Sequence, residues 1–140
     1  MRIAIDLNVL LDVLLDREPH VEHSSRVLAL LEQGLAEGYF CAASVDTLDY
    51  ILTKAYALPE RRKHLSTVRR LLAIATVDAT VIDAALNLGW DDLEDAIVHE
   101  SARLAGATAI VTRNPDDFAG ASIAIHTPTE FCAIANQLMT

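Results

Sequence analysis

Hydrophobic and polar positions along the chain alternate between short apolar runs and longer stretches with helical spacing. Apolar runs typical of strands lie at 2–6, 39–43, 74–77, 108–112 and 122–125. Helical spacing is found at 8–15, 21–37, 44–57, 60–72, 78–87, 93–104 and 130–138. Because strands and helices alternate, the pattern predicts a parallel sheet covered on both faces. The expected fold class is α/β, a three-layer α/β/α sandwich with a central parallel sheet of about five strands.

Residues typical of helix ends support these boundaries. Pro19 and Gly38 are expected to punctuate the two ends of the helix at 21–37. Ser44 and Asp78 are candidate N-caps for the helices that follow them. Gly106 is a suitable left-handed residue for the end of the helix at 93–104.

Length and composition favour one domain over residues 1–140. A chain of 140 residues that is 52% hydrophobic, with four prolines and five glycines, can bury a substantial core and has no composition typical of a disordered arm. No apolar run reaches the roughly 18 residues that span a bilayer, and the N-terminus lacks the pattern of a secretory signal. We therefore expect a cytoplasmic protein, with Cys41 and Cys132 as small core residues.

Four aspartates occupy the ends of strands or the beginnings of helices. Asp6 ends the first apolar run, Asp92 and Asp95 open the helix at 93–104, and Asp117 follows the run at 108–112. Right-handed crossovers bring the carboxyl ends of parallel strands to one edge of the sheet. Carboxylates without histidine or cysteine favour Mg²⁺ or Mn²⁺ over zinc.

Each aspartate also has a simpler structural explanation. Asp6 could cap the helix that begins near Asn8, and Asp92 and Asp95 have the three-residue spacing of a capping box. Asp117 lies in a Pro-Asp-Asp turn, where aspartate commonly bonds backbone amides. Capping does not explain why all these sites fall at one sheet edge.

Three segments make the chain resemble the PIN-domain family. They are Ile-Asp-Leu-Asn-Val-Leu-Leu-Asp at 5–12, Asp-Leu-Glu-Asp-Ala at 92–96 and Val-Thr-Arg-Asn-Pro-Asp-Asp-Phe at 111–118. Many members of that family are metal-dependent ribonucleases, including the VapC-type toxins of bacterial toxin–antitoxin pairs. The resemblance implies an endoribonuclease that uses Mg²⁺ or Mn²⁺. It implies catalytic roles for Asp6, Asp49, Asp95 and Asp117, and metal contacts from Asp6, Asp92, Asp95 and Asp117.

The chain departs from the family pattern at the second acid, which usually lies on the helix after the second strand. The segment 44–50 offers Asp46 and Asp49 but no glutamate. One alternative is therefore a catalytically degenerate PIN-like module that binds RNA or protein. A phosphoacceptor receiver domain is a weaker alternative, because the segment 122–128 lacks the lysine that receivers need after their fifth strand.

Supporting positions follow from the resemblance and from proximity in sequence. Asn8, Thr112 and Asn114 would orient the acids or a water, whereas Asp91, Glu94 and Asp116 are expected to be solvent-facing neighbours. His99 lies on the same helical face as Asp95 and is expected to be a surface or packing residue.

The formal charge of −9 is unusual for a protein that binds nucleic acid. Five of the eleven basic residues, Arg61, Arg62, Lys63, Arg69 and Arg70, gather on the helix at 60–72. That helix is either an RNA-contacting surface or a solvated face. The expected partners are an RNA substrate, an antitoxin protein and a second copy of the chain, the last because the helix near 9–15 has more apolar residues than one face needs.

Overall fold

The structure is a computed structural model that describes residues 1–140. It contains five strands, β1 (Arg2–Ile5), β2 (Glu37–Cys41), β3 (Ala73–Ala75), β4 (Ala109–Val111) and β5 (Ala124–His126). The helices are α1 (Leu7–Leu14), α2 (Val21–Glu32), α3 (Val45–Leu52), α4 (Leu58–Leu71), α5 (Ala79–Leu88), α6 (Leu93–Leu104) and α7 (Pro128–Leu138). Short 3-10 turns lie at Ala42–Ser44 and Pro115–Phe118.

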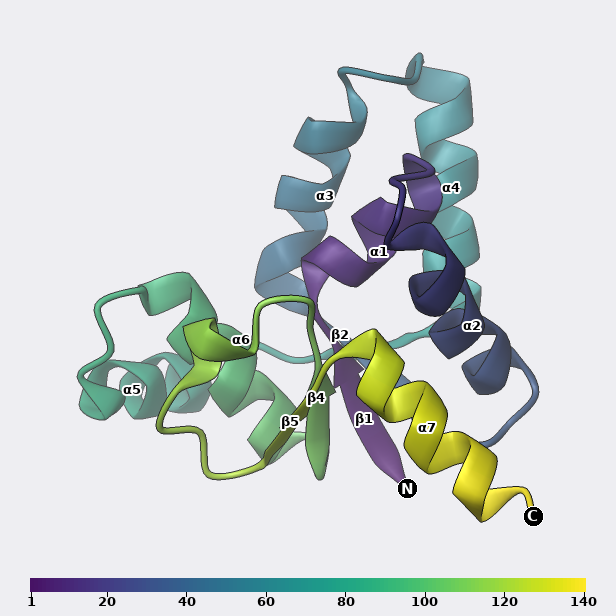
Figure 1. Ribbon diagram of the computed structural model, residues 1–140. Coiled ribbons are helices and arrows are strands. Elements are labelled where there is room, and N and C mark those ends of the chain that lie inside the picture. The colour runs from purple at the N-terminus through teal and green to yellow at the C-terminus, as the bar shows by residue number, and fades with distance from the viewer.

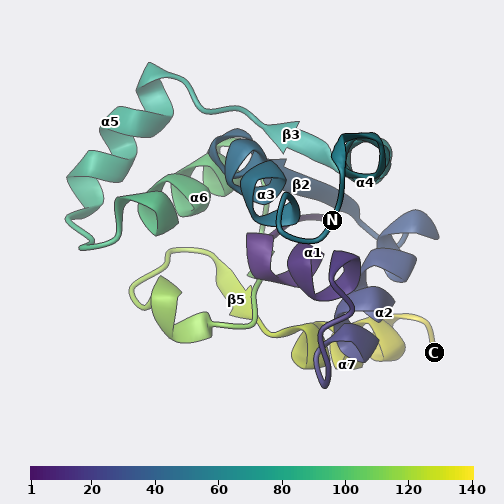
Figure 2. The same ribbon diagram turned by 90° about the horizontal axis from the view of Figure 1, so that it is seen from above.

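All five strands are parallel and form one sheet in the order β3-β2-β1-β4-β5. Helices α5 and α6 cover one face of the sheet, and α1, α2 and α7 cover the other (Figures 1 and 2). The α3–α4 hairpin rises beyond the carboxyl edge of the strands (Figure 1). The predicted three-layer α/β/α sandwich with a five-stranded parallel sheet is therefore confirmed.

Alternating burial along the central strand β1 supplies both faces of the sheet. Ile3 and Ile5 belong to the larger hydrophobic cluster, together with residues of α1, α2 and α7. Ala4, between them, belongs to the smaller cluster, together with Ile110 and residues of α6. Because both faces are covered, the strands read as short, nearly continuous apolar runs.

The predicted boundary between α2 and β2 is wrong. Helix α2 ends at Glu32, where Gly34 adopts φ +86° and the N–H of Leu35 donates to the carbonyl of Leu30 at 3.1 Å. Gly38, predicted to end this helix, instead lies inside β2. A Cβ there would lie 2.5 Å from Cδ2 of Leu72 and 2.7 Å from Cδ1 of Leu31. The glycine therefore permits close helix–sheet packing rather than a turn.

Other helix ends differ by shorter distances. Helix α3 stops at Leu52, and Ser44 precedes it without a side-chain capping hydrogen bond. Helix α7 begins before the predicted residue 130, because Thr127 and Glu130 form a reciprocal capping box. The predicted helix at 93–104 matches α6, and Asp78 caps α5 by accepting from the N–H of Val81 at 3.1 Å.

The apolar excess of α1 is used inside the domain. Val9 and Leu10 are fully buried, and Leu11 is nearly so. Part of the apolar surface on which the expected self-association rested is therefore covered inside the domain, and self-association stays a prediction. Cys41 and Cys132 are free and buried, as predicted. None of the helices is both long enough and apolar enough to cross a membrane.

Candidate active site

An acidic pocket lies at the carboxyl edge of the sheet, where β4 ends and α6 begins. Its volume is about 380 Å³, and its lining includes Asp92, Asp95 and Asp117. Asp92 and Asp95 come from the start of α6, and Asp117 from the 3-10 turn after β4. Figure 2 looks down on this edge of the sheet.

Asp6 lies directly after β1 and is held by three protein donors. Its Oδ1 accepts from the N–H of Leu7 at 2.8 Å, which caps α1. Its Oδ2 accepts from Oγ1 of Thr112 at 2.8 Å and from Nδ2 of Asn8 at 3.2 Å. Burial raises the pKa of Asp6 above its usual range, and the negative charge of Asp117 adds to this, although the hydrogen bonds oppose it.

Thr112, Asn8 and the segment after β4 form one hydrogen-bond network. The hydroxyl of Thr112 also accepts from the backbone N–H of Asn114 at 3.1 Å. Oδ1 of Asn8 accepts from the backbone N–H of Arg113 at 3.1 Å. The three predicted supporting residues therefore join β1, α1 and the segment that carries Asp117.

Asp95 shows that the aspartates lie within electrostatic reach of one another. Burial raises its pKa to about 7, and the charges of Asp92, Asp6 and Asp117 act in the same direction. Oδ1 of Asp92 also accepts from the backbone N–H of Asp95 at 3.1 Å. Asp92 therefore caps a helix and also lies close to the other aspartates at this edge.

No group of three or more histidine, cysteine or acidic side chains is already arranged to hold a metal ion. The donor chemistry nevertheless fits a hard divalent cation. The pocket contains carboxylate oxygens and no lysine or arginine. Burial, together with repulsion by the other aspartates, raises the pKa of Asp95, and a bound cation would relieve that repulsion.

The sequence pattern of the PIN domain matches residues 2–116. The chain belongs to the PIN-domain family. No curated protein matches it in sequence.

Solved structures share the fold of this PIN domain. A toxin–antitoxin complex from Klebsiella pneumoniae has a TM-score of 0.69 at 23% identity, covering 89% of this chain and 96% of that chain. VapBC2 from Rickettsia felis, bound to a DNA fragment from its promoter, has a TM-score of 0.71 at 15% identity, covering 91% and 98%. VapBC-1 from nontypeable Haemophilus influenzae has a TM-score of 0.71 at 10% identity, covering 92% and 99%.

The PIN domain does not group Asp46 and Asp49 with the other acids. Asp49 forms ion pairs with Arg61 at 3.2 Å and Arg62 at 2.8 Å, both on α4. Asp46 is exposed in the first turn of α3. Part of the basic surface of α4 is therefore occupied by an internal partner.

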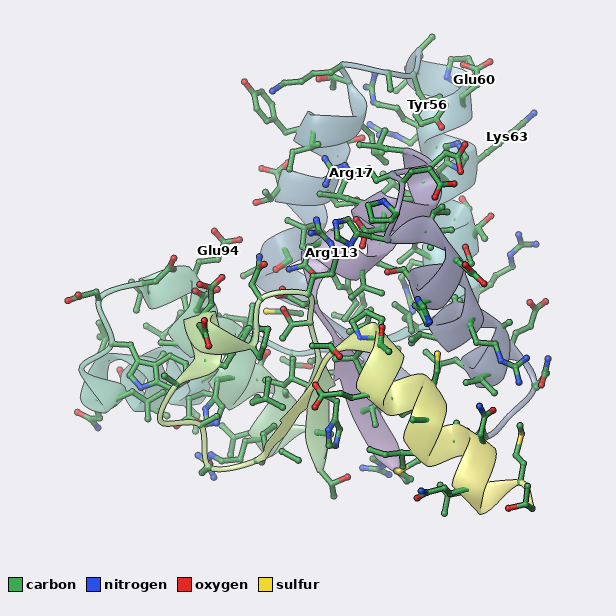
Figure 3. The ribbon with its side chains drawn as sticks, in the orientation of Figure 1. Arg17, Tyr56, Glu60, Lys63, Glu94 and Arg113 are labelled. Atoms are coloured by element: carbon green, nitrogen blue, oxygen red, sulfur yellow. The ribbon has the colours of Figure 1, made fainter.

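The neighbouring acids differ from one another in position. Asp91 and Asp116 are exposed, as predicted, but they also line the acidic pocket. Glu94 is exposed at the start of α6. The basic residue Arg113 lies above β4 (Figure 3).

An ion pair beside the site, with a fully buried aspartate, was not predicted. Asp12 on α1 is fully buried, and its Oδ2 lies 2.7 Å from Nε of Arg113 and accepts from Oγ of Ser24 at 2.9 Å. The pair links α1 and α2 to the segment after β4. Two sequence signals were available: Asp12 follows Asn8 by one helical turn, and Arg113 follows Thr112 directly.

Trp90 was also missed, although it immediately precedes the Asp91-Asp92 pair. It lines the acidic pocket and contacts His99, with 5.1 Å between ring centroids. His99 itself is buried and packs inside the domain, one of the two roles expected for it. The pocket therefore has an aromatic side as well as an acidic one.

Proposed function

We propose that this PIN domain is a metal-dependent endoribonuclease that hydrolyses RNA phosphodiester bonds with Mg²⁺ or Mn²⁺. The observation that carries the proposal is the convergence of Asp6, Asp92, Asp95 and Asp117 at one sheet edge. Family membership supports it, because many PIN domains are nucleases.

The proposed roles follow from the position of each side chain. Asp6, Asp95 and Asp117 would hold the cation, and Asp92 would contact it while also capping α6. The bound cation would supply an activated water and would offset charge on the scissile phosphate. Thr112 and Asn8 fix the orientation of Asp6 through their hydrogen bonds.

Asp49 remains in the proposal as the further catalytic acid, with a smaller expected contribution. Its carboxylate is paired with Arg61 and Arg62, so it would approach the pocket only after leaving them. Asp49→Asn is therefore expected to reduce cutting less than Asp95→Asn does.

The test is RNA cleavage by purified protein, free of any bound partner. Wild type should cut single-stranded RNA only when Mg²⁺ or Mn²⁺ is added, and Asp95→Asn should nearly abolish cutting. Asparagine can still serve near a helix start, so a purely structural role would survive the change. Asp83→Asn, an exposed change on α5, is the matched control and should cut like wild type.

A second candidate is a module that binds RNA or protein without cutting. The ion pairs of Asp49 favour it, because they remove one family acid from the pocket. Wild type that leaves structured and unstructured RNAs intact in both metals, yet retains them in a filter-binding assay, would establish this candidate in place of the nuclease.

The proposal extends to a toxin whose partner is a small antitoxin protein. The similar solved structures from Klebsiella pneumoniae, Rickettsia felis and Haemophilus influenzae are a toxin–antitoxin complex and VapBC proteins. Expression of the chain alone should arrest growth, and the product of a neighbouring gene should relieve the arrest by binding the purified protein. Growth at the normal rate during expression of active nuclease would contradict the toxin assignment.

We further propose a two-fold dimer that uses apolar side chains left uncovered by the fold. Tyr50, Leu58 and Leu86 are each more than half exposed, at 67%, 52% and 59%. A two-fold pair is the commonest closed assembly. Light scattering at micromolar concentration should give twice the chain mass, and a monomer mass throughout would overturn the proposal.

A further inference from the structure

Trp90 is the single tryptophan of the chain and forms part of the wall of the acidic pocket. Its ring is tilted by 50° against His99 and meets the edge of Phe118, with 6.2 Å between centroids. Both of these neighbours are almost completely buried. The indole is therefore held by packing against these neighbours, and the part of it that stays partly exposed lines the pocket.

We propose that Trp90 is a nucleobase-binding subsite, on which one unpaired base of the RNA stacks next to the phosphate held at the aspartates. The inference rests on the proposed function for the identity of the ligand. It adds to that function a residue outside the acidic set. It also gives a reason for preferring single strands, since both faces of a base inside a duplex are covered by its stacked neighbours.

Charge is the first physical argument for this subsite. The chain carries a formal charge of −9, and aspartates account for most of the remaining pocket wall. Phosphate contacts with basic side chains, the usual source of RNA affinity, are therefore scarce at the pocket. Stacking of a base on an aromatic ring is independent of that charge and tolerates every base.

Pre-organisation is the second argument. Because His99 and Phe118 already hold the ring, binding would immobilise little additional side-chain freedom. Gly120 lies close to the indole nitrogen, since an added Cβ there would be 3.8 Å from Nε1. The ring is thus held by its packed neighbours and also lines the pocket.

The alternative is that Trp90 only packs against the smaller core cluster, of which it is a partly buried neighbour. A packing role predicts a loss of stability on substitution and no change in RNA affinity at temperatures where the variant is folded. A stacking role predicts a loss of affinity and a rise in KM with little change in kcat. Trp90→Phe keeps a smaller aromatic face, whereas Trp90→Leu keeps only apolar volume.

The experiment uses the fluorescence of the sole tryptophan as a direct report from the pocket. The probes are a nuclease-resistant hexa-adenylate, with 2′-O-methyl sugars and phosphorothioate linkages, and an abasic strand with the same backbone, both with Mg²⁺. The hexa-adenylate should quench Trp90 emission saturably, and the abasic strand should not. Trp90→Leu should bind end-labelled hexa-adenylate about five- to one-hundredfold more weakly, with Trp90→Phe in between.

A matched control is Tyr39→Leu, which removes a half-buried aromatic side chain from β2, outside the acidic pocket, and should bind within about twofold of wild type. Circular dichroism identifies the temperatures at which each variant is folded. If Trp90→Leu fails to fold, Trp90→Phe and the two-probe comparison on wild type still decide.

The outcomes separate this inference from the nuclease proposal. Wild type that cuts RNA, with unchanged KM in both Trp90 variants, would overturn the subsite and leave the nuclease standing. Quenching by hexa-adenylate but not by the abasic strand, without cutting in either metal, would support the subsite and reject the nuclease. Absence of both quenching and cutting would reject both.

Discussion

At the scale of single residues, the site depends on carboxylates that serve two purposes. Asp6 and Asp92 each use one oxygen to cap a helix, α1 and α6 respectively. The other oxygen of Asp6 accepts from Thr112 and Asn8. Helix capping thus places these carboxylates near one another, and a bound cation would relieve the repulsion between them.

Thr112→Val tests the importance of the hydroxyl that joins Asp6 to Asn114. Valine has nearly the same shape, but it removes a donor to the Asp6 carboxylate and the acceptor for the N–H of Asn114. Because Thr112 is fully buried, we expect a loss of about 1–3 kcal/mol in the free energy of unfolding. Urea denaturation measures it. The exposed Thr67→Val on α4 should change stability by much less, and equal losses would contradict the argument.

His99 makes stability depend on pH. Its Nε2 accepts from the backbone N–H of Ser122 at 3.1 Å. Burial lowers its pKa below the usual 6.5, although Glu100, whose carboxylate lies 3.2 Å from Nδ1, acts in the opposite direction. Above pH 6.5 the residue is neutral in both folded and unfolded chains. As pH falls below 6.5 the unfolded chain binds the proton first, so this contribution to stability is progressively lost down to the folded pKa.

The measurement is urea unfolding of wild type and His99→Gln between pH 8 and pH 5. Glutamine can still accept a hydrogen bond but does not titrate in this range. Wild type should therefore lose stability relative to His99→Gln as the pH falls. Parallel pH profiles for the two proteins would show that His99 does not carry the effect.

At the scale of elements, the position of the site depends on how closely helices approach the sheet. Gly38 in β2 lets Leu31 of α2 and Leu72, directly after α4, meet over the strand. Beyond the carboxyl edge, the ion pair between buried Asp12 and partly exposed Arg113 ties α1 to the segment after β4. In the register of β1 and β4, Ile5 pairs with Val111, which places Asp6 beside Thr112.

Gly38→Ala is expected to destabilise the fold by about 1–3 kcal/mol, because the added methyl overpacks a buried contact. The free energy of unfolding by urea checks this. Combining the change with Leu72→Ala makes room for the methyl, so the double variant should lose less stability than the sum of the single variants. Simple additivity would show that the close approach is not the cause.

At the scale of the whole molecule, an acidic chain concentrates further negative charge at one edge of its sheet. The formal charge of −9 and the raised pKa of Asp95 both indicate that a further negative charge at this edge is unfavourable. Ionised Asp95 is disfavoured in the metal-free fold, and a bound cation would reverse this. Folding and ligand binding are therefore coupled through the same carboxylates.

Millimolar Mg²⁺ or Mn²⁺ should raise the melting temperature by several degrees, because a ligand that binds only the folded state stabilises it. Differential scanning calorimetry provides the measurement. Asp6→Asn/Asp95→Asn should lose the shift, whereas Asp83→Asn should keep it. At pH 8 without metal, Asp95→Asn should melt no lower than wild type, since it removes a repelled charge. An equal metal shift in the double variant would exclude this edge as the binding site.

The sequence by itself determined the layers of the fold and most of the acidic set. Helical and strand periodicity are local properties, so α6 and the five parallel strands could be predicted from them. Asp6, Asp92, Asp95 and Asp117 could be placed at one edge because crossover handedness is general. Family membership was visible in three short segments and is confirmed over residues 2–116.

Only the tertiary structure decided contacts between residues far apart in the chain. Gly38 is a turn signal locally but a packing residue in the fold, because Leu31 and Leu72 converge on it. Asp49 resembles a site residue by position, yet arginines on the next helix pair with it. The burial of His99 and the placement of Trp90 at the pocket likewise depend on which elements pack together, and periodicity carries no information about side-chain partners across elements.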